Sequence, residues 1–177
     1  VGEDYALIIT SCNGLWRYRI GDTVTFTSTK PYRIRITGRT KQFINVFGEE
    51  LMVSNTEQAL SYACRECGAD VGDYTVAPVY MTDREKGRHQ WIIEFTRRPD
   101  DMARFEQLLD AELQRLNSDY EAKRHSTLGA PQFTAVDEGT FLGWLSAQGK
   151  AGGQNKVPRL ANNRQYVDQI EDFIKRK

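Results

Sequence analysis

The sequence has 177 residues, of which 40% are hydrophobic, and its 24 basic and 24 acidic residues give a formal net charge of zero. This length is sufficient for one good core, or for a small domain with an appendage. The balanced charge argues against a nucleic-acid groove and against binding to an anionic membrane. No apolar run approaches the length of a membrane span and no signal-peptide pattern opens the chain, so we expect a cytoplasmic protein.

The first forty residues predict a small antiparallel β meander. A continuous apolar run typical of a buried strand comes first, and Asn13-Gly14 is a strong hairpin turn after it. Alternating apolar and polar residues then predict further short strands. The expected strands span residues 5–10, 15–20, 24–27 and 32–37. We expect this meander to expose a face that another domain covers.

Helices and strands alternate from residue 40 onwards. Ser54 and Glu57 have the spacing of a capping box, and apolar residues at helical spacing follow as far as Gly68, which ends the predicted helix. Later elements are predicted as strands at 74–80, 90–96 and 132–136, a charged hairpin tip at 83–87, and helices from Asp101 to Leu116, from Thr140 to about Gly149 and over 166–174. This order predicts a mixed β-sheet covered by helices.

Particular residues define the faces of these elements. Trp91, Ile93 and Phe95 alternate along one strand and therefore share a face. The apolar stripe of the helix that Pro99-Asp100-Asp101 opens is expected to cover the sheet. Thr140 is expected to cap the short helix that follows the last strand.

Three short motifs carry chemical interest. In Tyr18-Arg19-Ile20-Gly21-Asp22, a tight turn at Gly21 would hold the Asp22 carboxylate where its two oxygens can accept both hydroxyls of a ribose. Gly38-Arg39 brings a backbone pivot and a planar cation together at a strand end. The third motif, Gln154 to Arg159, overlaps the end of a glycine-rich stretch at 149–155. We expect this stretch to be flexible and to carry Lys156 on a mobile tether. Taken singly, each motif has an ordinary structural explanation.

The order and spacing of these motifs resemble the adenylate-forming enzymes, in particular the auxin-responsive acyl-acid amido synthetases and their bacterial relatives. The resemblance covers nearly the whole chain. Such enzymes also carry a large N-terminal domain with a Ser/Thr/Gly-rich phosphate loop, which these residues lack, and the chain starts at Val1 without an initiator Met. We therefore expect the C-terminal third of a longer protein: residues 1–39 as the end of the large domain, and 40–177 as a C-terminal lid domain of α/β (α+β) fold.

The resemblance implies a reaction in two steps. A carboxylic acid attacks the α-phosphate of ATP, with Mg2+, to give an acyl-adenylate, and the amine of an amino acid then displaces AMP. Lys156 is implied as the catalytic cation at the α-phosphate, reaching the nucleotide when the lid closes. Asp22 is implied at the ribose hydroxyls. The partners implied are the two small-molecule substrates and the protein's own N-terminal domain.

The remaining implied roles concern the nucleotide and the hinge. Tyr18 and Arg19 alternate on their strand, so one would face the nucleotide or acyl site while the other packs. Gly38 and Arg39 mark the hinge about which the lid swings, and Arg39 is also implied in nucleotide binding. Arg159 would either hold phosphate or pin its loop to an acidic neighbour, two readings that we weigh equally.

Several residues are left out of the predicted site. Many family members have a lysine where Glu50 stands, so Glu49 and Glu50 are excluded from the catalytic set. His89 and His125 are expected on the surface, and Cys64 and Cys67 are expected as reduced thiols at the end of a helix. The three tryptophans, Trp16, Trp91 and Trp144, are expected in the core, and no metal site is expected.

Two other functions remain open from the sequence. The nearer is a different adenylate-forming enzyme, such as an acyl-thioester ligase. In that enzyme coenzyme A, rather than an amine, would displace AMP from the acyl-adenylate. The more distant is a non-enzymatic α/β binding module, because a sheet covered by helices serves many functions.

Overall fold

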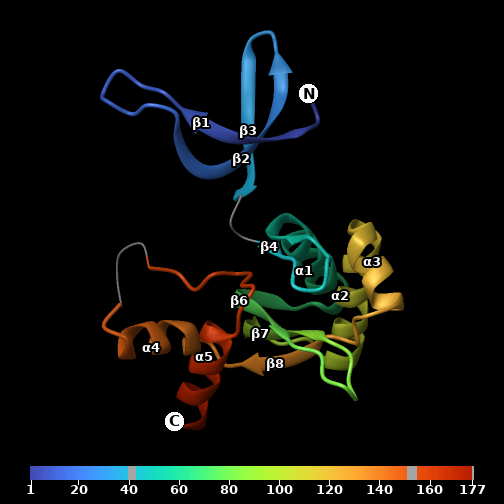
Figure 1. Cartoon of the computed structure of the whole chain (residues 1–177). Coiled ribbons are helices and arrows are strands. Elements are labelled where there is room, and N and C mark those ends of the chain that lie inside the picture. The colour runs from blue at the N-terminus through green and yellow to red at the C-terminus, as the bar shows by residue number, and fades with distance from the viewer. Residues whose placement is uncertain (40–42, 151–154, 177) are drawn as a thin grey trace.

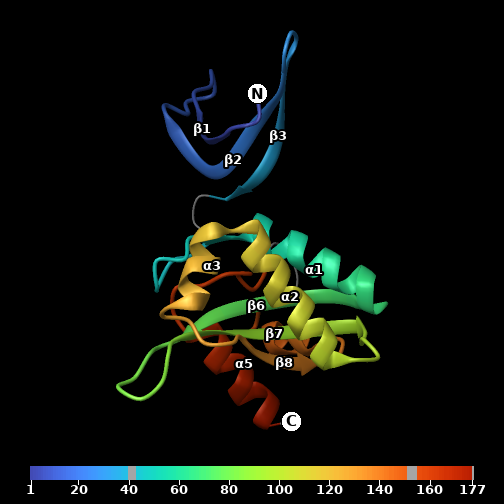
Figure 2. The same cartoon turned by 90° about the vertical axis from the view of Figure 1, so that its right-hand side faces the viewer.

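The computed structural model describes residues 1–39, 43–150 and 155–176. Figures 1 and 2 show two parts: a sheet of three strands formed by the start of the chain, and an α/β body formed by the rest. Within the described ranges no helix has both the length and the apolar character that crossing a membrane requires. The mixture of an antiparallel sheet and a mixed sheet covered by helices confirms the predicted α/β (α+β) fold class.

The first sheet is antiparallel, with the strand order β1-β2-β3. Its strands are β1 (Asp4–Ile9), β2 (Tyr18–Thr29) and β3 (Tyr32–Arg39). The predicted meander is confirmed, but it has three strands where four were expected. The sheet also continues through Gly38 and Arg39, which were expected where the strand ends.

The expected turn at Gly21 is wrong. β2 runs through this glycine, which has a φ of 91° and lies where the register with β1 shifts between Ala6 and Ile8. A glycine with positive φ allows a strand to bulge and bend without ending, because pairing resumes on the far side. One long bent strand therefore replaces the two short strands predicted at 15–20 and 24–27.

The meander is a single layer and leaves its apolar side chains exposed. Of residues 1–37, only Val24 and Thr25 are buried. The exposed large apolar side chains are Val1, Tyr5, Ile8, Leu15, Trp16, Tyr18, Ile20, Tyr32, Ile34 and Ile36. The expectation of an exposed apolar face is confirmed, whereas the buried first strand is wrong. The core position expected for Trp16 is also wrong: it is 79% exposed in the loop between β1 and β2, where no second layer covers it.

The α/β body is built on a mixed sheet of three strands, β6 (Asp70–Val79), β7 (Arg88–Arg97) and β8 (Gln132–Val136). β7 lies in the middle, antiparallel to β6 and parallel to β8. The helices α1 (Val53–Cys67), α2 (Met102–Leu116) and α3 (Ser118–His125) lie over one face of this sheet. α4 (Thr140–Ala147) and α5 (Gln165–Lys175) lie over the other face.

Each face of the sheet carries its own core, as the alternation along β7 predicts. Trp91, Ile93 and Phe95 point into the larger cluster with α1 and α2, while Ile92 points into the smaller cluster with α4 and α5. Trp91 is fully buried and stacks on Tyr74 with ring centroids 5.7 Å apart. Burial of each such side chain contributes about 1.5–3 kcal/mol, so the two clusters stabilise the body from both sides.

The helix starts differ in part from their predictions. α2 begins directly after Pro99-Asp100-Asp101 as expected, and Asp101 is its cap, because its carboxylate accepts a hydrogen bond from the Arg104 N–H. α1 starts two residues earlier than the Ser54 capping box implied: Met52 is its N-cap, and Asn55 rather than Glu57 reaches back, to the N–H of Met52. Thr140 is the first helical residue of α4 and not its cap, since its hydroxyl donates to the carbonyl of Asp137.

A two-stranded sheet, β4 (Phe43–Ile44) and β5 (Leu51–Met52), leads into α1. Its connecting turn, residues 45–50, has positive φ at Gly48 (84°) and at Glu50 (37°). Positive φ is uncommon for a residue other than glycine, so contacts elsewhere must hold this turn in shape.

Candidate functional site

Strand register brings two of the predicted nucleotide-binding residues opposite each other. Asp22 of β2 pairs with Arg39 of β3, and Thr23 pairs with Gly38. Asp22 is partly buried, and it follows the bulge at Gly21 that bends the strand. An acidic and a basic residue therefore lie at neighbouring backbone positions at the end of the meander nearer the α/β body (Figure 1).

Tyr18 and Arg19 lie at the start of β2, opposite Ile9 and Ile8 of β1. Adjacent strand residues point to opposite faces, so the two side chains are on different sides of the sheet, as expected. Both are exposed, and the Tyr18 ring is 51% exposed. Neither side chain belongs to a core in this structure.

The segment that bears Lys156 is tied to the free edge of β6. The N–H of Val76 donates to the carbonyl of Arg159, and the N–H of Ala161 donates to the carbonyl of Val76, at 2.9 and 3.0 Å. The Thr75 hydroxyl donates to the carbonyl of Pro158. These bonds extend the sheet by a short parallel bridge and fix the chain on the C-terminal side of Lys156.

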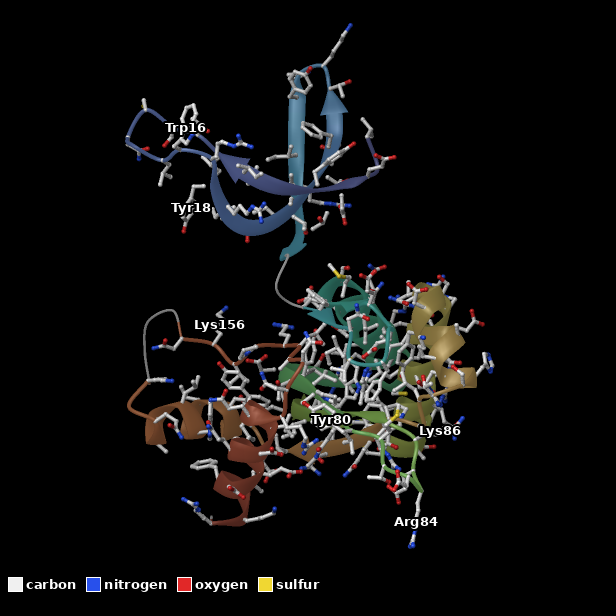
Figure 3. The ribbon with its side chains drawn as sticks, viewed as in Figure 1. Trp16, Tyr18, Tyr80, Arg84, Lys86 and Lys156 are labelled. Atoms are coloured by element: carbon white, nitrogen blue, oxygen red, sulfur yellow. The ribbon has the colours of Figure 1, made fainter. Side chains whose placement is uncertain are left out.

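Lys156 itself is exposed. It is the last residue before the buried Val157, and it makes no hydrogen bond or ion pair with the residues that the structure describes. In Figure 3 its side chain extends from the α/β body on the side where the meander lies. The predicted flexible stretch at 149–155 falls largely on residues 151–154, which lie outside the described residues.

Arg159, only three residues further on, is engaged within the body. Its guanidinium is 3.3 Å from the Glu57 carboxylate and lies 4.8 Å from the centre of the Tyr74 ring. Of the two roles weighed for Arg159, these contacts favour the one that pins the segment to an acidic neighbour. The pKa of Arg159 is raised: burial alone would lower the pKa, but the contacts with Tyr74 and the nearby carboxylates outweigh that effect.

Arg159 borders a small cavity of about 250 Å3 between α1 and the start of β6. Glu57 and Tyr74 line this cavity, and so does Cys64. Burial raises the pKa of the Cys64 thiol, which keeps the thiol protonated and unreactive. Cys64 and Cys67 lie in the last turn of α1, where the sequence pattern expected them.

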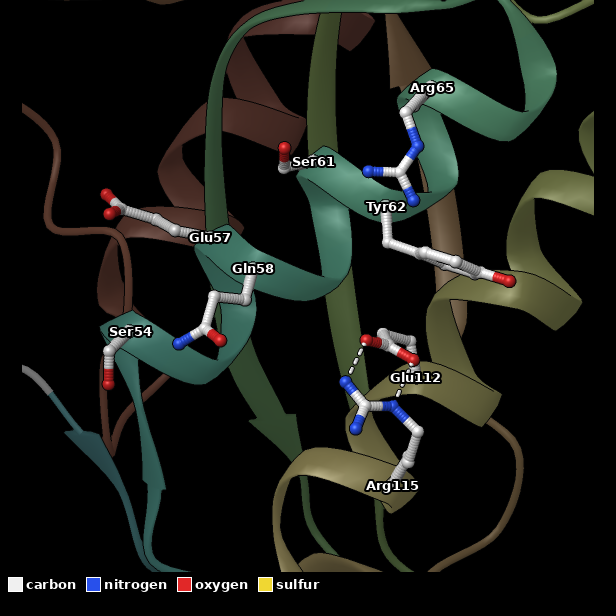
Figure 4. A pocket seen from close by; sticks show the side chains of 8 residues that line it. All are labelled: Ser54, Glu57, Gln58, Ser61, Tyr62, Arg65, Glu112 and Arg115. Atoms are coloured by element: carbon white, nitrogen blue, oxygen red, sulfur yellow. Dashed lines mark hydrogen bonds and ion pairs between the residues drawn. The ribbon is translucent and has the colours of Figure 1, made fainter.

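A larger hollow of about 700 Å3 lies on the outer surfaces of α1 and α2 (Figure 4). Its basic residues are already occupied: Arg115 makes two hydrogen bonds to Glu112, and Arg65 lies over the Tyr62 ring. None of the predicted site residues lines this hollow. We assign it no function.

The turn at residues 45–50 is held by a buried hydrogen bond between Glu49 and His89. The side chains of Glu49 and His89 are both fully buried, and His89 Nε2 lies 2.8 Å from Glu49 Oε1. The other carboxylate oxygen accepts the N–H of Phe47 at 2.7 Å. The surface position expected for His89 is therefore wrong, because the histidine lies beneath the Phe47 ring and stacks on Tyr120.

Two opposing effects set the protonation of Glu49. Burial alone would raise its pKa, but the hydrogen bond and charge interaction with His89, with help from backbone N–H groups, leave the pKa below its ordinary value. The carboxylate is therefore ionised and accepts, and His89 Nε2 donates. Forty residues separate the partners, and no periodic pattern in the sequence relates them.

Comparison with known proteins identifies the chain. The model of the GH3 family C-terminal domain matches residues 54–165, and that of the GH3 family central domain matches residues 1–39. The chain belongs to the GH3 family. This confirms the resemblance to the auxin-responsive acyl-acid amido synthetases, while the bacterial origin stays a prediction.

Individual GH3 proteins resemble the chain over almost its full length. The indole-3-acetic acid-amido synthetase GH3.10 of Arabidopsis thaliana is 27% identical over 97% of this chain and 30% of that protein. The structure of the GH3.15 acyl acid amido synthetase covers 97% of this chain and 33% of its own, with a TM-score of 0.78 and 19% identity. A complex of AtGH3.15 with 2,4-DB gives a TM-score of 0.75. The chain thus spans about a third of the length of the relatives that it matches.

Proposed function

We propose that this chain is the C-terminal part of an ATP-dependent acyl-acid amido synthetase, which adenylates a carboxylic acid and transfers the acyl group to the amine of an amino acid. The observation that carries the proposal is membership of the GH3 family, with relatives named as amido synthetases matching over nearly the whole chain. The shared fold with an acyl acid amido synthetase supports the same assignment.

The division of labour that we propose follows the two parts of the structure. Residues 1–39 are the end of the large N-terminal domain, and residues 40–177 are the lid that swings about Gly38 and Arg39. The exposed apolar face of the meander supports this division, because a face with so many large apolar side chains normally packs against protein. The protein's own N-terminal domain is the partner that we propose for this face, and the cytoplasm is the compartment.

Lys156 is the proposed catalytic cation. Negative charge builds up on the oxygens of the α-phosphate as the carboxylate attacks, so a cation that arrives only in the reactive geometry lowers the barrier. Lys156 suits this role because its charge is exposed and is not neutralised by a described neighbour. Its long stem carries a compact charge that can reach a ligand outside its own domain.

Asp22 is the proposed ligand of the ribose hydroxyls, with Arg39, Tyr18 and Arg19 near the nucleotide. The pairing of Asp22 with Arg39 supports a shared site at this end of the meander. Mg2+ is proposed to arrive with the triphosphate, because this ion is usually bound through substrate phosphates together with one or two carboxylates. The chemistry that the ion supplies is neutralisation of the phosphate oxygens.

The proposal is tested by carboxylate-dependent pyrophosphate exchange in the intact enzyme. Lys156→Ala should lower kcat by about a hundredfold or more, the scale seen when one donor to a developing negative charge is removed. Lys156→Arg keeps the charge and should retain part of the activity, and Lys150→Ala, another lysine of the same region, should change little. Full activity of Lys156→Ala would remove this lysine from the mechanism.

The nature of the acyl acceptor is tested separately. Release of AMP from a preformed acyl-adenylate is measured with a panel of amino acids and with coenzyme A. An amido synthetase responds to an amino acid, and a response to coenzyme A alone would instead make the enzyme a thioester ligase.

A further inference from the structure

Asn162 joins two segments that are far apart in the sequence. Its side-chain N–H donates to the carbonyl of Phe43, and its side-chain oxygen accepts the N–H of Asn45, both at 2.8 Å. One amide therefore bonds to the carbonyl and the N–H of residues two apart, as the backbone of a neighbouring strand would. We call this pair of bonds the Asn162 clamp.

The two clamped segments are those that the proposed mechanism must coordinate. Phe43 and Asn45 belong to the first described stretch of the α/β body after the meander, and Phe43 opens β4. Asn162 follows Lys156 by six residues and lies at the end of the segment that is bonded to β6. Figure 1 shows this segment running to the edge of β6 close to β4.

Little freedom remains between Lys156 and the clamp. Val157 and Leu160 are buried, in the smaller and larger core clusters respectively. Val76 bonds to the backbone on both sides of Leu160, and the Tyr80 hydroxyl is 3.4 Å from the carbonyl of Asn162. The clamp therefore holds the Phe43 segment in a fixed position relative to the segment that starts at Lys156 and to β6.

We propose that Asn162 is a positioning residue that couples the entry of the lid domain to Lys156. The clamp keeps the Lys156 segment and β4 as one body, so that the lid domain carries Lys156 with it when it moves. This inference rests on the proposed function, because it assigns the clamp a role only through Lys156.

The chemistry of the clamp requires an amide. Aspartate at this position keeps an acceptor for Asn45 but loses the donor to Phe43, and it places a carboxylate beside a carbonyl oxygen. Alanine loses both bonds. Asn162 is exposed, so water can replace the lost bonds and the variants should fold. What they lose is the fixed geometry between the two segments.

The test uses pyrophosphate exchange in the intact enzyme with Asn162→Ala and Asn162→Asp. A small misplacement of a catalytic group can cost a factor of about 100, so kcat should fall by about 10- to 100-fold. The KM for ATP should stay within about twofold, because Lys156 acts in the transition state and not in ground-state binding. Asn163→Ala is the matched control: this neighbouring asparagine is exposed, and among the described residues its side chain bonds only to the N–H of Gln165, so activity should be unchanged.

A double variant distinguishes positioning from general damage. In the Lys156→Ala background, Asn162→Ala should have no further effect, because the residue through which it acts is gone. An equal fold loss in both backgrounds would overturn the proposal, and so would a wild-type kcat for Asn162→Ala in the native background.

Hydrogen exchange keeps a failure of the clamp distinct from a failure of the proposed function. Asn162→Ala should speed amide exchange at Asn45, whose N–H loses its acceptor, and in the peptide after Lys156. Unchanged exchange at Asn45 would show that no clamp exists. If exchange rises while Lys156→Ala keeps full activity, the clamp is real but the catalytic role of Lys156 fails, and with it the role of Asn162 in positioning that lysine.

Discussion

Glu49→Ala should destabilise the α/β body strongly. The substitution removes the acceptor of two donors at once, the Nε2–H of His89 and the N–H of Phe47. Each buried donor left without a partner costs about 1–3 kcal/mol, which gives about 2–6 kcal/mol for the pair.

Glu49→Gln keeps the shape of the side chain but removes its negative charge. The amide can accept the Phe47 N–H with its oxygen, but its NH2 group then faces His89 Nε2, so the ring must change tautomer. The proton then moves to Nδ1, which is buried and has no hydrogen-bond partner among the described residues. This orphaned donor should cost about 1–3 kcal/mol, which places Glu49→Gln between the wild type and Glu49→Ala.

Urea unfolding followed by tryptophan fluorescence measures these losses, because Trp91 and Trp144 are buried in the body that unfolds. The control is Glu50→Ala, which removes the adjacent carboxylate. Because Glu50 is exposed, the free energy of unfolding of this variant should stay within about 0.5 kcal/mol of the wild type. A loss below 1 kcal/mol for Glu49→Ala would refute the view that the Glu49–His89 pair holds the turn.

The same pair predicts a pH dependence with a defined sign. The pKa of Glu49 is lower in the folded protein than in the unfolded chain, so the unfolded state binds the proton more readily. The stability from this group is fully present above the unfolded pKa and is lost as the pH falls through the folded pKa. The stability difference between the wild type and Glu49→Ala should therefore be largest near neutral pH and shrink in acid.

Two further substitutions test the framework of the body. Asp101→Ala removes the carboxylate that accepts the Arg104 N–H at the start of α2 and should cost about 1 kcal/mol in urea unfolding, whereas the neighbouring Asp100→Ala, which is not the cap, should cost much less. Arg159→Ala removes both the ion pair with Glu57 and the stacking on Tyr74. Because the ion pair is half exposed, we expect the free energy of unfolding to fall by about 1–2 kcal/mol in total. A wild-type urea midpoint would show that these contacts do not anchor the segment.

The sequence predicted most of the α/β body because its elements repeat a simple pattern. The strand at 132–136 was predicted to the residue, and the two faces of β7 followed from alternation. α3 was not predicted, since its residues are nearly all polar and only Tyr120 is buried. A helix that is held mainly by its position against α2 leaves no periodic apolar signal.

Long-range pairs account for the errors at the site. His89 directly follows Arg88 and the charged hairpin tip in the sequence, yet it faces Glu49, which folding brings from forty residues away. Gly21 carried a turn signal, but β2 pairs with β1 on both sides of this glycine and therefore continues through it. The pairing of Asp22 with Arg39 likewise depends on strand register, which local propensity does not fix.

Lys156 and Arg159 illustrate how two cations three residues apart come to differ. The planar guanidinium of Arg159 can stack on Tyr74 and still reach Glu57, so burial against the body suits it. The ammonium of Lys156 is strongly hydrated and would lose that hydration in such a place, and it stands just outside the first buried anchor, Val157. Arg159 thus anchors the segment to the α/β body, whereas the exposed Lys156 can reach the proposed ligand. Exchanging the two residues should weaken both the anchoring of the segment and the proposed contact with the α-phosphate. A lysine at 159 cannot stack on Tyr74 and bridge to Glu57 in the same way. An arginine at 156 spreads its charge over a planar group, whereas the proposed contact needs a compact charge.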